Sequence, residues 1–383
     1  MNTLPLSLYV HIPWCVRKCP YCDFNSHEQH GALPEKAYLK ALLDDLDCDA
    51  GYIQNRELVS VFFGGGTPSL FSPEFYQQFL TAVRSRIAFA PDIEITVEAN
   101  PGTYEHGKFE EYREAGVNRL SIGVQSFNAD ALTQLGRIHN RNEAFRAIEA
   151  AHQAGFDNFN LDLMHGLPGQ NLKLALADLH NAIDLAPTHI SWYQLTIEPN
   201  TVFYRSQPTL PDEETLDTIF ERGLRTLAEA GYAQYEVSAF AKAQRQAKHN
   251  LNYWQYGDYL GIGAGAHGKI SMLNERGEPV ITRMRKTRLP KDYLSAAPQQ
   301  RTVELNQIEA LDRPYEFMMN ALRLKQGVPA ALFSERTFLP LETIASKLSA
   351  LRQRGLLLED ADRLQTTDTG FRFLNDVVMR FTD

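Results

Sequence analysis

Short apolar runs alternate with amphipathic segments from Leu6 to Leu195. Apolar runs of strand length favour β-strands, whereas apolar residues at every third or fourth position favour helices. Strands are expected at Leu6–Ile12, Leu58–Phe63, Ile93–Val97, Leu120–Val124, Phe159–Met164 and His189–Leu195, with helices between them at 34–54, 73–87, 104–115, 141–154 and 172–185. Strand–helix units in series predict parallel strands joined by right-handed crossovers. The expected fold is α/β, a partial (β/α)6 barrel; a doubly wound sheet is the alternative, because periodicity does not separate the two.

The pattern changes after Thr196. A helix is expected at 212–230. Apolar runs at 235–240 and 259–264 flank a polar, aromatic segment at 249–254. Residues 269–300 are mixed in character and rich in turn-forming residues. Beyond these, helices are expected at 315–324 and 341–354, short strands at 356–359 and 363–366, and a last helix at 370–381. This order resembles a winged-helix module. We therefore expect a barrel at 1–200, a barrel extension at 201–300 and a winged-helix-like α+β domain at 301–383.

The composition is that of a globular protein, with 44% hydrophobic and 22% charged residues among 383. No run approaches the roughly 18 apolar residues of a membrane-spanning helix, and Met1–Val10 lacks the features of a signal peptide. The formal net charge of −9 argues against a general polyanion-binding protein. We expect a cytoplasmic protein with no transmembrane segment and no nucleic-acid partner.

Three of the four cysteines, Cys15, Cys19 and Cys22, form a C-x3-C-x2-C pattern directly after the first expected strand. Barrel enzymes keep their chemistry at the carboxyl ends of such strands. A [4Fe–4S] cluster has four irons, so three thiolates would leave one iron free to bind something else. Structural zinc, the alternative, needs four closed ligands. The residues that would complete a zinc site are His11, His27 and Cys48.

Polar and glycine residues occupy the ends of the following strands. Gly64–Pro68 (GGGTP) ends the second strand, and three glycines let backbone groups approach a ligand closely. Glu98, Gln125 and Asp162 lie at the ends of the third to fifth strands or within them, and Arg137 follows the fourth. Carboxylates accept hydrogen bonds from ribose hydroxyls or an ammonium, and arginine pairs with a carboxylate. Such a set suits a small zwitterionic cofactor that carries a ribose.

The cysteine pattern followed by GGGTP resembles the radical S-adenosylmethionine (SAM) superfamily. The resemblance implies that the free iron binds the amino and carboxylate groups of SAM. An electron from the cluster then cleaves the sulfonium to a 5′-deoxyadenosyl radical, and the protein supplies position.

The motifs YVHIPWC (9–15), GVQSF (123–127) and DLMHGLPG (162–169) look like the branch that contains oxygen-independent coproporphyrinogen III oxidase. This resemblance implies that Cys15, Cys19 and Cys22 hold the cluster and that the SAM-contacting positions are Tyr9, Tyr21, Gly65, Gly66, Thr67, Glu98, Gln125, Arg137 and Asp162. The chain departs from the oxidase pattern in two ways. Phe24 stands where the oxidase has a fourth cysteine, and few residues precede the first strand. Both departures argue against the oxidase activity.

The segment 249–254 (HNLNYW) matches the H-N-x-x-Y-W motif of the HemW family of haem chaperones. Histidine is a usual axial ligand of haem iron, and flat aromatic rings pack against the macrocycle. The resemblance implies a haem site at His249, Asn250, Tyr253 and Trp254. His267 is a second candidate ligand, although a structural role is the favoured interpretation of that residue. The structural alternative is a loop histidine beside two aromatic residues anchored in a core.

The resemblance to the HemW family implies a haem chaperone with a [4Fe–4S] cluster and SAM, and coproporphyrinogen III dehydrogenation is the alternative activity. The expected partners are haem and acceptor haemoproteins, including respiratory ones at a membrane surface, where the protein would be peripheral. Whether the chain catalyses a reaction stays open from the sequence. A basic run at 283–291 is expected either to meet haem propionates or an acidic partner, or to be a solvated surface.

Overall fold

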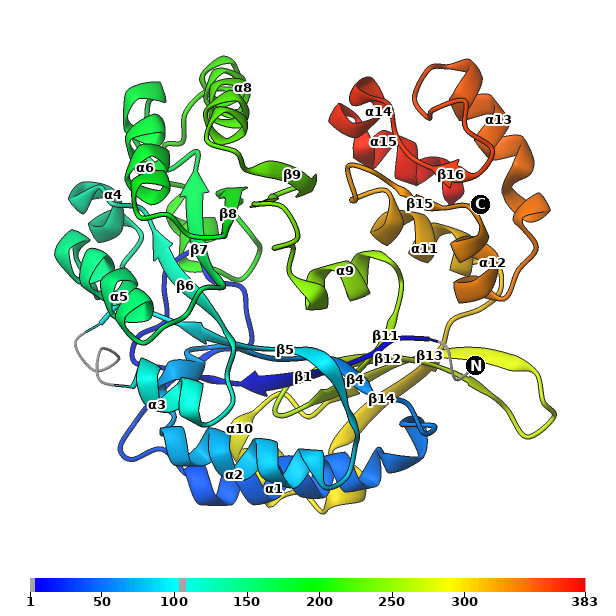
Figure 1. Ribbon diagram of the computed structural model, residues 1–383, viewed down its shortest axis with the longest axis horizontal. Coiled ribbons are helices and arrows are strands. Elements are labelled where there is room, and N and C mark those ends of the chain that lie inside the picture. The colour runs from blue at the N-terminus through cyan, green and yellow to red at the C-terminus, as the bar shows by residue number, and fades with distance from the viewer. Residues whose placement is uncertain (1–3, 103–107, 383) are drawn as a thin grey trace.

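The computed structural model describes residues 4–102 and 108–382. Its main feature is a parallel sheet whose first six strands follow one another in chain order (Figure 1). The six strands are β1 (Leu6–Ile12), β4 (Leu58–Gly65), β5 (Phe89–Ala99), β6 (Arg119–Gln125), β7 (Phe159–His165) and β8 (His189–Gln194). This order confirms the partial barrel, because a doubly wound sheet reverses its strand order at a switch point. Within the described ranges the end strands of the sheet do not pair with each other, so the barrel is open.

Helices cover the outer face of this sheet. The larger ones are α1 (Glu35–Cys48), α2 (Pro73–Arg84), α5 (Arg141–Gln153), α6 (Leu172–Asp184) and α8 (Glu213–Glu229), with the shorter α3 (Phe109–Glu114) between α2 and β6. Local capping explains why α5 begins where it does: the Asn140 side chain and the Glu143 side chain form a reciprocal capping box at its first turn. The helix expected at 104–115 is described only from residue 108 onwards.

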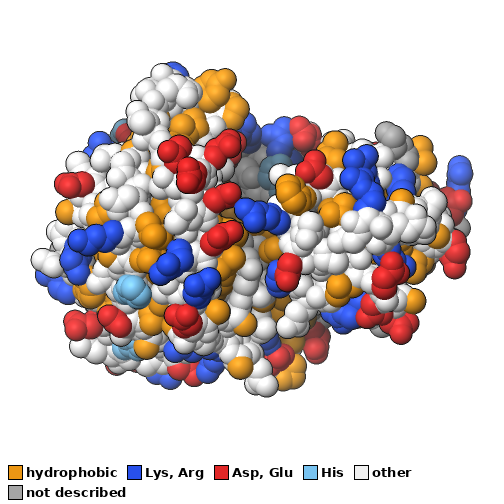
Figure 2. Space-filling view, turned by 90° about the horizontal axis from the view of Figure 1, so that it is seen from above, with side chains coloured by type: hydrophobic (Ala, Val, Ile, Leu, Met, Phe, Trp, Pro, Cys, Tyr) orange, Lys and Arg blue, Asp and Glu red, His pale blue; other side chains and the backbone are white. Residues whose placement is uncertain are grey.

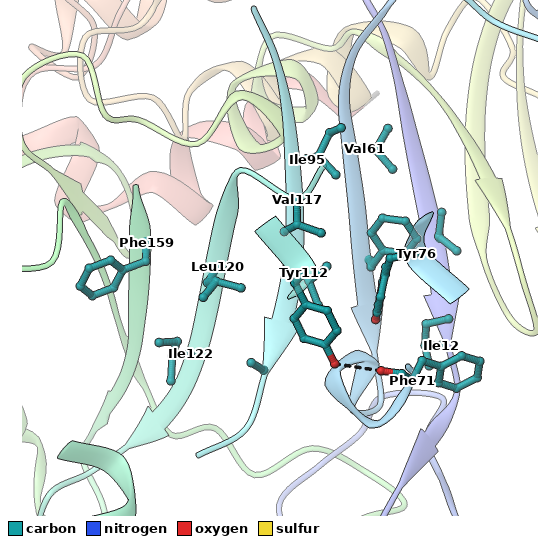
Figure 3. Close-up of a cluster of buried hydrophobic side chains, with 14 of the residues drawn as sticks. Ile12, Val61, Phe71, Tyr76, Ile95, Tyr112, Val117, Leu120, Ile122 and Phe159 are labelled. Atoms are coloured by element: carbon teal, nitrogen blue, oxygen red, sulfur yellow. Dashed lines mark hydrogen bonds between the residues drawn. The ribbon is translucent and has the colours of Figure 1, made fainter. Parts of the chain in front are cut away.

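The core lies between the strands and the outer helices (Figure 3). Val61 of β4 and Leu120 of β6 belong to the same buried cluster as Tyr76 of α2 and Tyr112 of α3, and Phe159 of β7 extends the cluster along the sheet. The Tyr112 hydroxyl donates a hydrogen bond of 2.9 Å to the carbonyl oxygen of Phe71. Since the tyrosine hydroxyls reach backbone carbonyls, these large side chains bury apolar area without an unpaired polar group.

The sheet is longer than the hydrophobic pattern predicted. β11 (Asp258–Ile262) pairs parallel to β1, and β12 (His267–Leu273), β13 (Pro279–Lys286) and β14 (Thr302–Gln307) continue it antiparallel. At the other edge, β10 (Ala239–Ala241) and β9 (Ala233–Glu236) follow β8. The turn-rich expectation for 269–300 was therefore wrong over β12 and β13. Lys269 and Lys286 are buried on these strands in ion pairs. Because two inward-facing positions hold lysine, the sequence does not show the alternation of apolar and polar residues that marks a strand.

The C-terminal module packs around a second hydrophobic core, to which β10, β13 and the α9 region also contribute Ala239, Ile281 and Trp254. It contains α11 (Arg313–Ala321), α12 (Ala331–Thr337), α13 (Ala345–Gln353), α14 (Asp368–Arg372) and α15 (Leu374–Val378), with β15 (Val328–Pro329) paired to β16 (Arg363–Leu364). The expected hairpin is reduced to one bridge between Leu357 and Thr366. The expected helix at 370–381 is interrupted at Phe373, where α14 ends.

A short helix, α9 (Lys248–Trp254), lies between the barrel and the C-terminal module (Figure 1). It packs against β1, β4 and β11 on one side and against α11 on the other. None of the helices in the described ranges combines the length and apolarity needed to cross a bilayer. On the face shown in Figure 2, acidic and basic side chains of the described residues are interspersed and not separated by sign.

Candidate functional site

The three clustered cysteines lie on the loop that follows β1. Cys15 ends the short strand β2 (Trp14–Cys15), which pairs with β3 (His27–Glu28) and so closes the loop on itself. All three thiols are free, with Cys15 buried and the other two partly exposed. Burial raises the pKa of the Cys15 thiol. Within the described residues, no three His, Cys, Asp or Glu side chains converge on a position for a single metal ion.

The cysteine loop approaches the end of β4 so closely that only glycine fits at two positions of the glycine run. A Cβ atom on Gly65, whose φ is +116°, would lie 2.5 Å from the His11 ring. A Cβ atom on Gly66 would lie 2.5 Å from the carbonyl oxygen of Trp14. The Gly66 N–H donates to the Ile12 carbonyl at 2.7 Å, and the Thr67 N–H donates to the Trp14 carbonyl at 2.7 Å. The glycines therefore hold the cysteine loop against β4, a packing role that the sequence did not separate from ligand approach.

Two carboxylates, Glu98 near the carboxyl end of β5 and Asp162 in the middle of β7, form no salt bridge with a residue in the described ranges. Glu98 accepts a hydrogen bond of 3.1 Å from the Gly65 N–H, and Asp162 accepts one of 2.9 Å from the Ser121 hydroxyl. Burial and the nearby Asp162 raise the pKa of Glu98 to about 8, and burial raises the pKa of Asp162. Two half-buried carboxylates without a salt-bridge partner among the described residues fit a cationic ligand.

Arg137 reaches the cysteine loop from the segment after α4 (Ala129–Gln134). Its Nη1 lies 3.6 Å from the Cys19 Sγ, and its Nη2 donates to the Gly123 carbonyl at 2.8 Å. Its Nε is buried without a partner. The unpaired N–H of this guanidinium fits an anionic ligand group.

The remaining predicted SAM positions surround this arginine. Gln125 ends β6 in a left-handed conformation, and its Oε1 accepts a hydrogen bond of 2.8 Å from the Tyr193 hydroxyl. Tyr21 packs 6.3 Å from Phe203, ring centre to ring centre, and Phe203 lies on the short helix α7 (Val202–Ser206). The Phe203 N–H donates to the Pro20 carbonyl at 2.9 Å, so α7 covers one side of the cysteine loop.

A cavity of about 780 Å³ joins part of the predicted SAM positions to part of the predicted haem segment. Tyr9, Gly65 and Glu98 line it on the barrel side, and Tyr253 and Trp254 line it from α9. Its volume falls within the roughly 300–1,000 Å³ typical of ligand sites. Other lining residues that matter below are Phe24, Asn25, Tyr259, His267, Arg285 and Arg288. The cavity places the two sites expected from sequence next to each other.

The other two residues of the HNxxYW motif do not line this cavity. His249 is buried, its ring packs 4.1 Å from the Phe62 ring, and its Nδ1 lies 3.0 Å from the Glu94 carboxylate. Burial lowers the pKa of His249 below its usual value. The Asn250 amide donates to the Tyr235 hydroxyl at 3.0 Å. The segment forms α9 and not a loop, with its histidine on the barrel side of the helix.

Asn25 connects the cysteine loop to the opposite wall of the cavity, a role that no sequence motif indicated. Its side-chain amide donates to the carbonyls of Ala264 and Arg288, each at 2.9 Å. The backbone carbonyl of Asn25 accepts a hydrogen bond from His11 Nε2 at 2.9 Å. In turn, His11 Nδ1 accepts one from the Tyr9 hydroxyl at 2.8 Å. Tertiary contacts that span more than 200 residues leave no trace in local spacing, so only the structure reveals this link.

Comparisons with known proteins agree with these features. Two family models match, "Radical SAM superfamily" over residues 9–186 and "HemN C-terminal domain" over residues 308–373. The chain is 52% identical over 378 residues to the Heme chaperone HemW of Escherichia coli (strain K12) and 51% identical over 381 residues to that of Haemophilus influenzae, with 98% of each chain covered in both pairs.

The corresponding protein of Bacillus subtilis is 35% identical, again with 98% of both chains covered. Among solved structures, the E. coli coproporphyrinogen III oxidase (HemN), a radical SAM enzyme, matches with a TM-score of 0.83 at 23% identity, covering 100% of this chain and 91% of that one. This likeness confirms the expected fold.

Proposed function

The chain belongs to the HemW family of the radical SAM superfamily, and on that premise we propose that it is a haem chaperone that binds haem in the cavity and passes it to acceptor haemoproteins. The observation that carries the proposal is the single cavity lined by Glu98 on one side and by Tyr253 and Trp254 on the other. The rival activity is coproporphyrinogen III dehydrogenation. Against it, the position of the oxidase's additional cysteine is held by Phe24, whose side chain is 65% exposed at the cavity wall.

The donor set fits a [4Fe–4S] cluster and SAM. Cys15, Cys19 and Cys22 would hold the cluster, since three free thiols share one loop and a guanidinium lies beside one of them. Glu98 and Asp162 would face the positive charges of SAM, and the unpaired Nε of Arg137 would meet an anionic group. When bound, the cluster and SAM supply one-electron chemistry. The protein's own part is to position the sulfonium and to keep the two carboxylates away from bulk water.

SAM binding is expected to strengthen as the pH rises from 6 to 8 and to level off above that. In the free protein Glu98 keeps its proton up to a pKa of about 8, whereas a cationic ligand favours the carboxylate, so binding releases a proton. The affinity should rise by up to about tenfold per pH unit. Calorimetry in buffers of different ionisation enthalpy measures the released proton. Glu98→Gln should bind SAM with less pH dependence, while Glu110→Gln on α3 should behave as wild type. An unchanged pH profile in Glu98→Gln would rule out this linkage.

We propose that Tyr253 and Trp254 contact haem, while His249 and Asn250 hold α9 in place. Tyr253 also meets the Tyr259 ring edge-on, with ring centres 4.7 Å apart, so aromatic surface faces the cavity from both α9 and β11. Flat aromatic surface suits a macrocycle. The proposed acceptors are haemoproteins, including respiratory ones docked at a membrane surface, and the proposed location is cytoplasmic. The names of the curated relatives support the haem and acceptor parts of this proposal.

Haem titration followed by transfer to an apo-haemoprotein tests the function. Protein reconstituted with its cluster without oxygen should bind one haem per chain and lose it to the acceptor. Tyr253→Ala with Trp254→Ala should weaken haem binding roughly tenfold or more through lost aromatic contact. In parallel, anaerobic incubation with coproporphyrinogen III and SAM should give no protoporphyrinogen IX. Turnover of that substrate, or absence of haem binding by the wild type, would contradict the chaperone proposal.

A further inference from the structure

We propose that His267, the first residue of β12, is the axial ligand of the haem iron, and that Arg288 receives a haem propionate. This proposal rests on the haem-chaperone function proposed above and deepens it by assigning the ligand. Both residues line the cavity, and both are exposed within it.

His267 is the histidine of the cavity whose ring nitrogens are free to bind iron. Two histidines line the cavity, His11 and His267. Both nitrogens of His11 are engaged, Nδ1 by the Tyr9 hydroxyl and Nε2 by the Asn25 carbonyl. Across the described part of the chain, no hydrogen bond or ion pair holds the His267 ring. His249 lies outside the lining, and its Nδ1 is committed to Glu94. A ligand histidine needs an open nitrogen facing the ligand, and His267 meets that condition.

The electrostatic surroundings of His267 favour the neutral imidazole that iron requires. Partial burial and the guanidinium of Arg285, its direct cross-strand neighbour on β13, lower the pKa of His267 below its usual value. Arg283 and Arg288 act in the same direction, and Glu304 acts against them. A neutral imidazole at neutral pH binds iron without first losing a proton.

Of the basic run 283–291, Arg288 is the residue that both lines the cavity and has no ion pair within the described ranges. Arg283 pairs with Glu316, Arg285 pairs with Glu304, and Lys286 is buried between two aspartates. Arg288 has no ion pair with any residue in ranges 4–102 and 108–382, and its side chain is exposed at the cavity. An unpaired guanidinium in an electropositive wall is suited to bind a carboxylate in bidentate fashion.

The wall that carries these two residues is fixed to the cysteine loop. Asn25 holds the carbonyls of Ala264 and Arg288, and a Cβ atom on Gly265 would lie 2.2 Å from the Asn25 amide nitrogen. His267 follows two residues after Gly265. The position of the proposed ligand therefore depends on the loop that bears Cys22, while Tyr253 and Trp254 approach the cavity from α9.

Absorption and electron paramagnetic resonance spectra of the haem-loaded, cluster-reconstituted protein test the assignment. His267→Ala should lose the wild-type Soret position and the histidine-ligand signal, and weaken haem binding at least tenfold; added imidazole should restore the spectrum. Arg288→Ala should keep the spectrum but weaken binding roughly tenfold, as loss of a charge-assisted hydrogen bond does. His180→Ala on α6 and Arg276→Ala in the β12–β13 turn are exposed controls that should match wild type.

The outcomes separate this proposal from the function on which it rests. Failure of the wild type to bind haem would overturn the proposed function. A wild type that binds haem together with a His267→Ala spectrum that is unchanged, or with loss of the histidine signal in His249→Ala alone, would overturn the ligand assignment and leave the function standing. Since His267 is exposed, its replacement by Ala or Gln should leave the far-ultraviolet circular dichroism unchanged.

Discussion

Serine in place of Cys19 or Cys22 is expected to remove the iron–sulfur cluster, whereas serine in place of Cys48 should leave it intact. Wild-type protein reconstituted without oxygen should hold about four iron atoms per chain. The Cys19→Ser and Cys22→Ser proteins should hold less than about a tenth of that, because each loses one of the three thiolates proposed to hold the cluster. Cys48 is not placed to substitute, because it is the last residue of α1, and a crossover helix ends at the edge of the sheet opposite the loop that follows β1.

This loss is measured by iron and sulfide analysis and by the visible absorption of the cluster. Cys48→Ser is the matched control, since it removes a thiol from the same chain without touching the loop. If Cys48→Ser lost as much iron as Cys19→Ser, the cluster would not be confined to the C-x3-C-x2-C loop. If the wild type held one zinc ion in place of iron, the zinc alternative would replace the cluster.

The strands that could be predicted carry an apolar run strong enough to outweigh the buried polar residues within it, such as Glu94 on β5 and Ser121 on β6. β1 reads LSLYVHI and is buried almost throughout, so its sequence alone marks a strand. β13 reads PVITRMRK and contains the buried Lys286, so its sequence looks like a solvated basic run. Charges that are compensated by residues more than 200 positions away cannot be recognised from local pattern. The predicted boundaries at residues 200 and 300 stay a prediction.

The candidate site was predictable where a motif occupies one loop. The cysteine loop, the glycine run and Glu98 come together because consecutive parallel strands end at the same edge. The roles of the HNxxYW residues were harder to predict, because the motif forms a helix that places its residues on opposite sides of the helix axis. Tyr253 and Trp254 face the cavity, whereas the His249 ring packs on Phe62 and the His249 N–H donates to the Glu94 carboxylate at 3.4 Å. The motif gives residue types, but only the helix shows which of them can reach a ligand.

Removal of the Lys286 ammonium is expected to lower the free energy of unfolding by about 3–5 kcal/mol. This is the largest loss of stability that we expect from any single substitution of a buried residue. Lys286 on β13 is buried, and its Nζ lies 2.7 Å from both Asp45 and Asp49 of the α1 region. Although burial lowers the pKa of Lys286, the two carboxylates outweigh it and raise that pKa above its usual value. In Lys286→Ala these carboxylates stay buried without a cation. Urea unfolding followed by circular dichroism measures the loss.

Two further variants and the pH separate the cause from simple loss of packing. Lys286→Met keeps the aliphatic stem, so it should be nearly as destabilised as Lys286→Ala if the unpaired carboxylates are responsible. Lys40→Ala, which breaks an exposed pair with Asp44, should change stability by no more than about 0.5 kcal/mol.

The pH dependence follows from one of the same two carboxylates. Burial raises the pKa of Asp49, and the Lys286 ammonium opposes that rise. Without Lys286 the ionisation of Asp49 destabilises the fold as the pH rises, so the deficit of Lys286→Ala should shrink from pH 7 to pH 5. A Lys286→Met protein as stable as wild type, or a deficit that grows toward pH 5, would mean that β13 is held to α1 by apolar contact and not by this buried ion network.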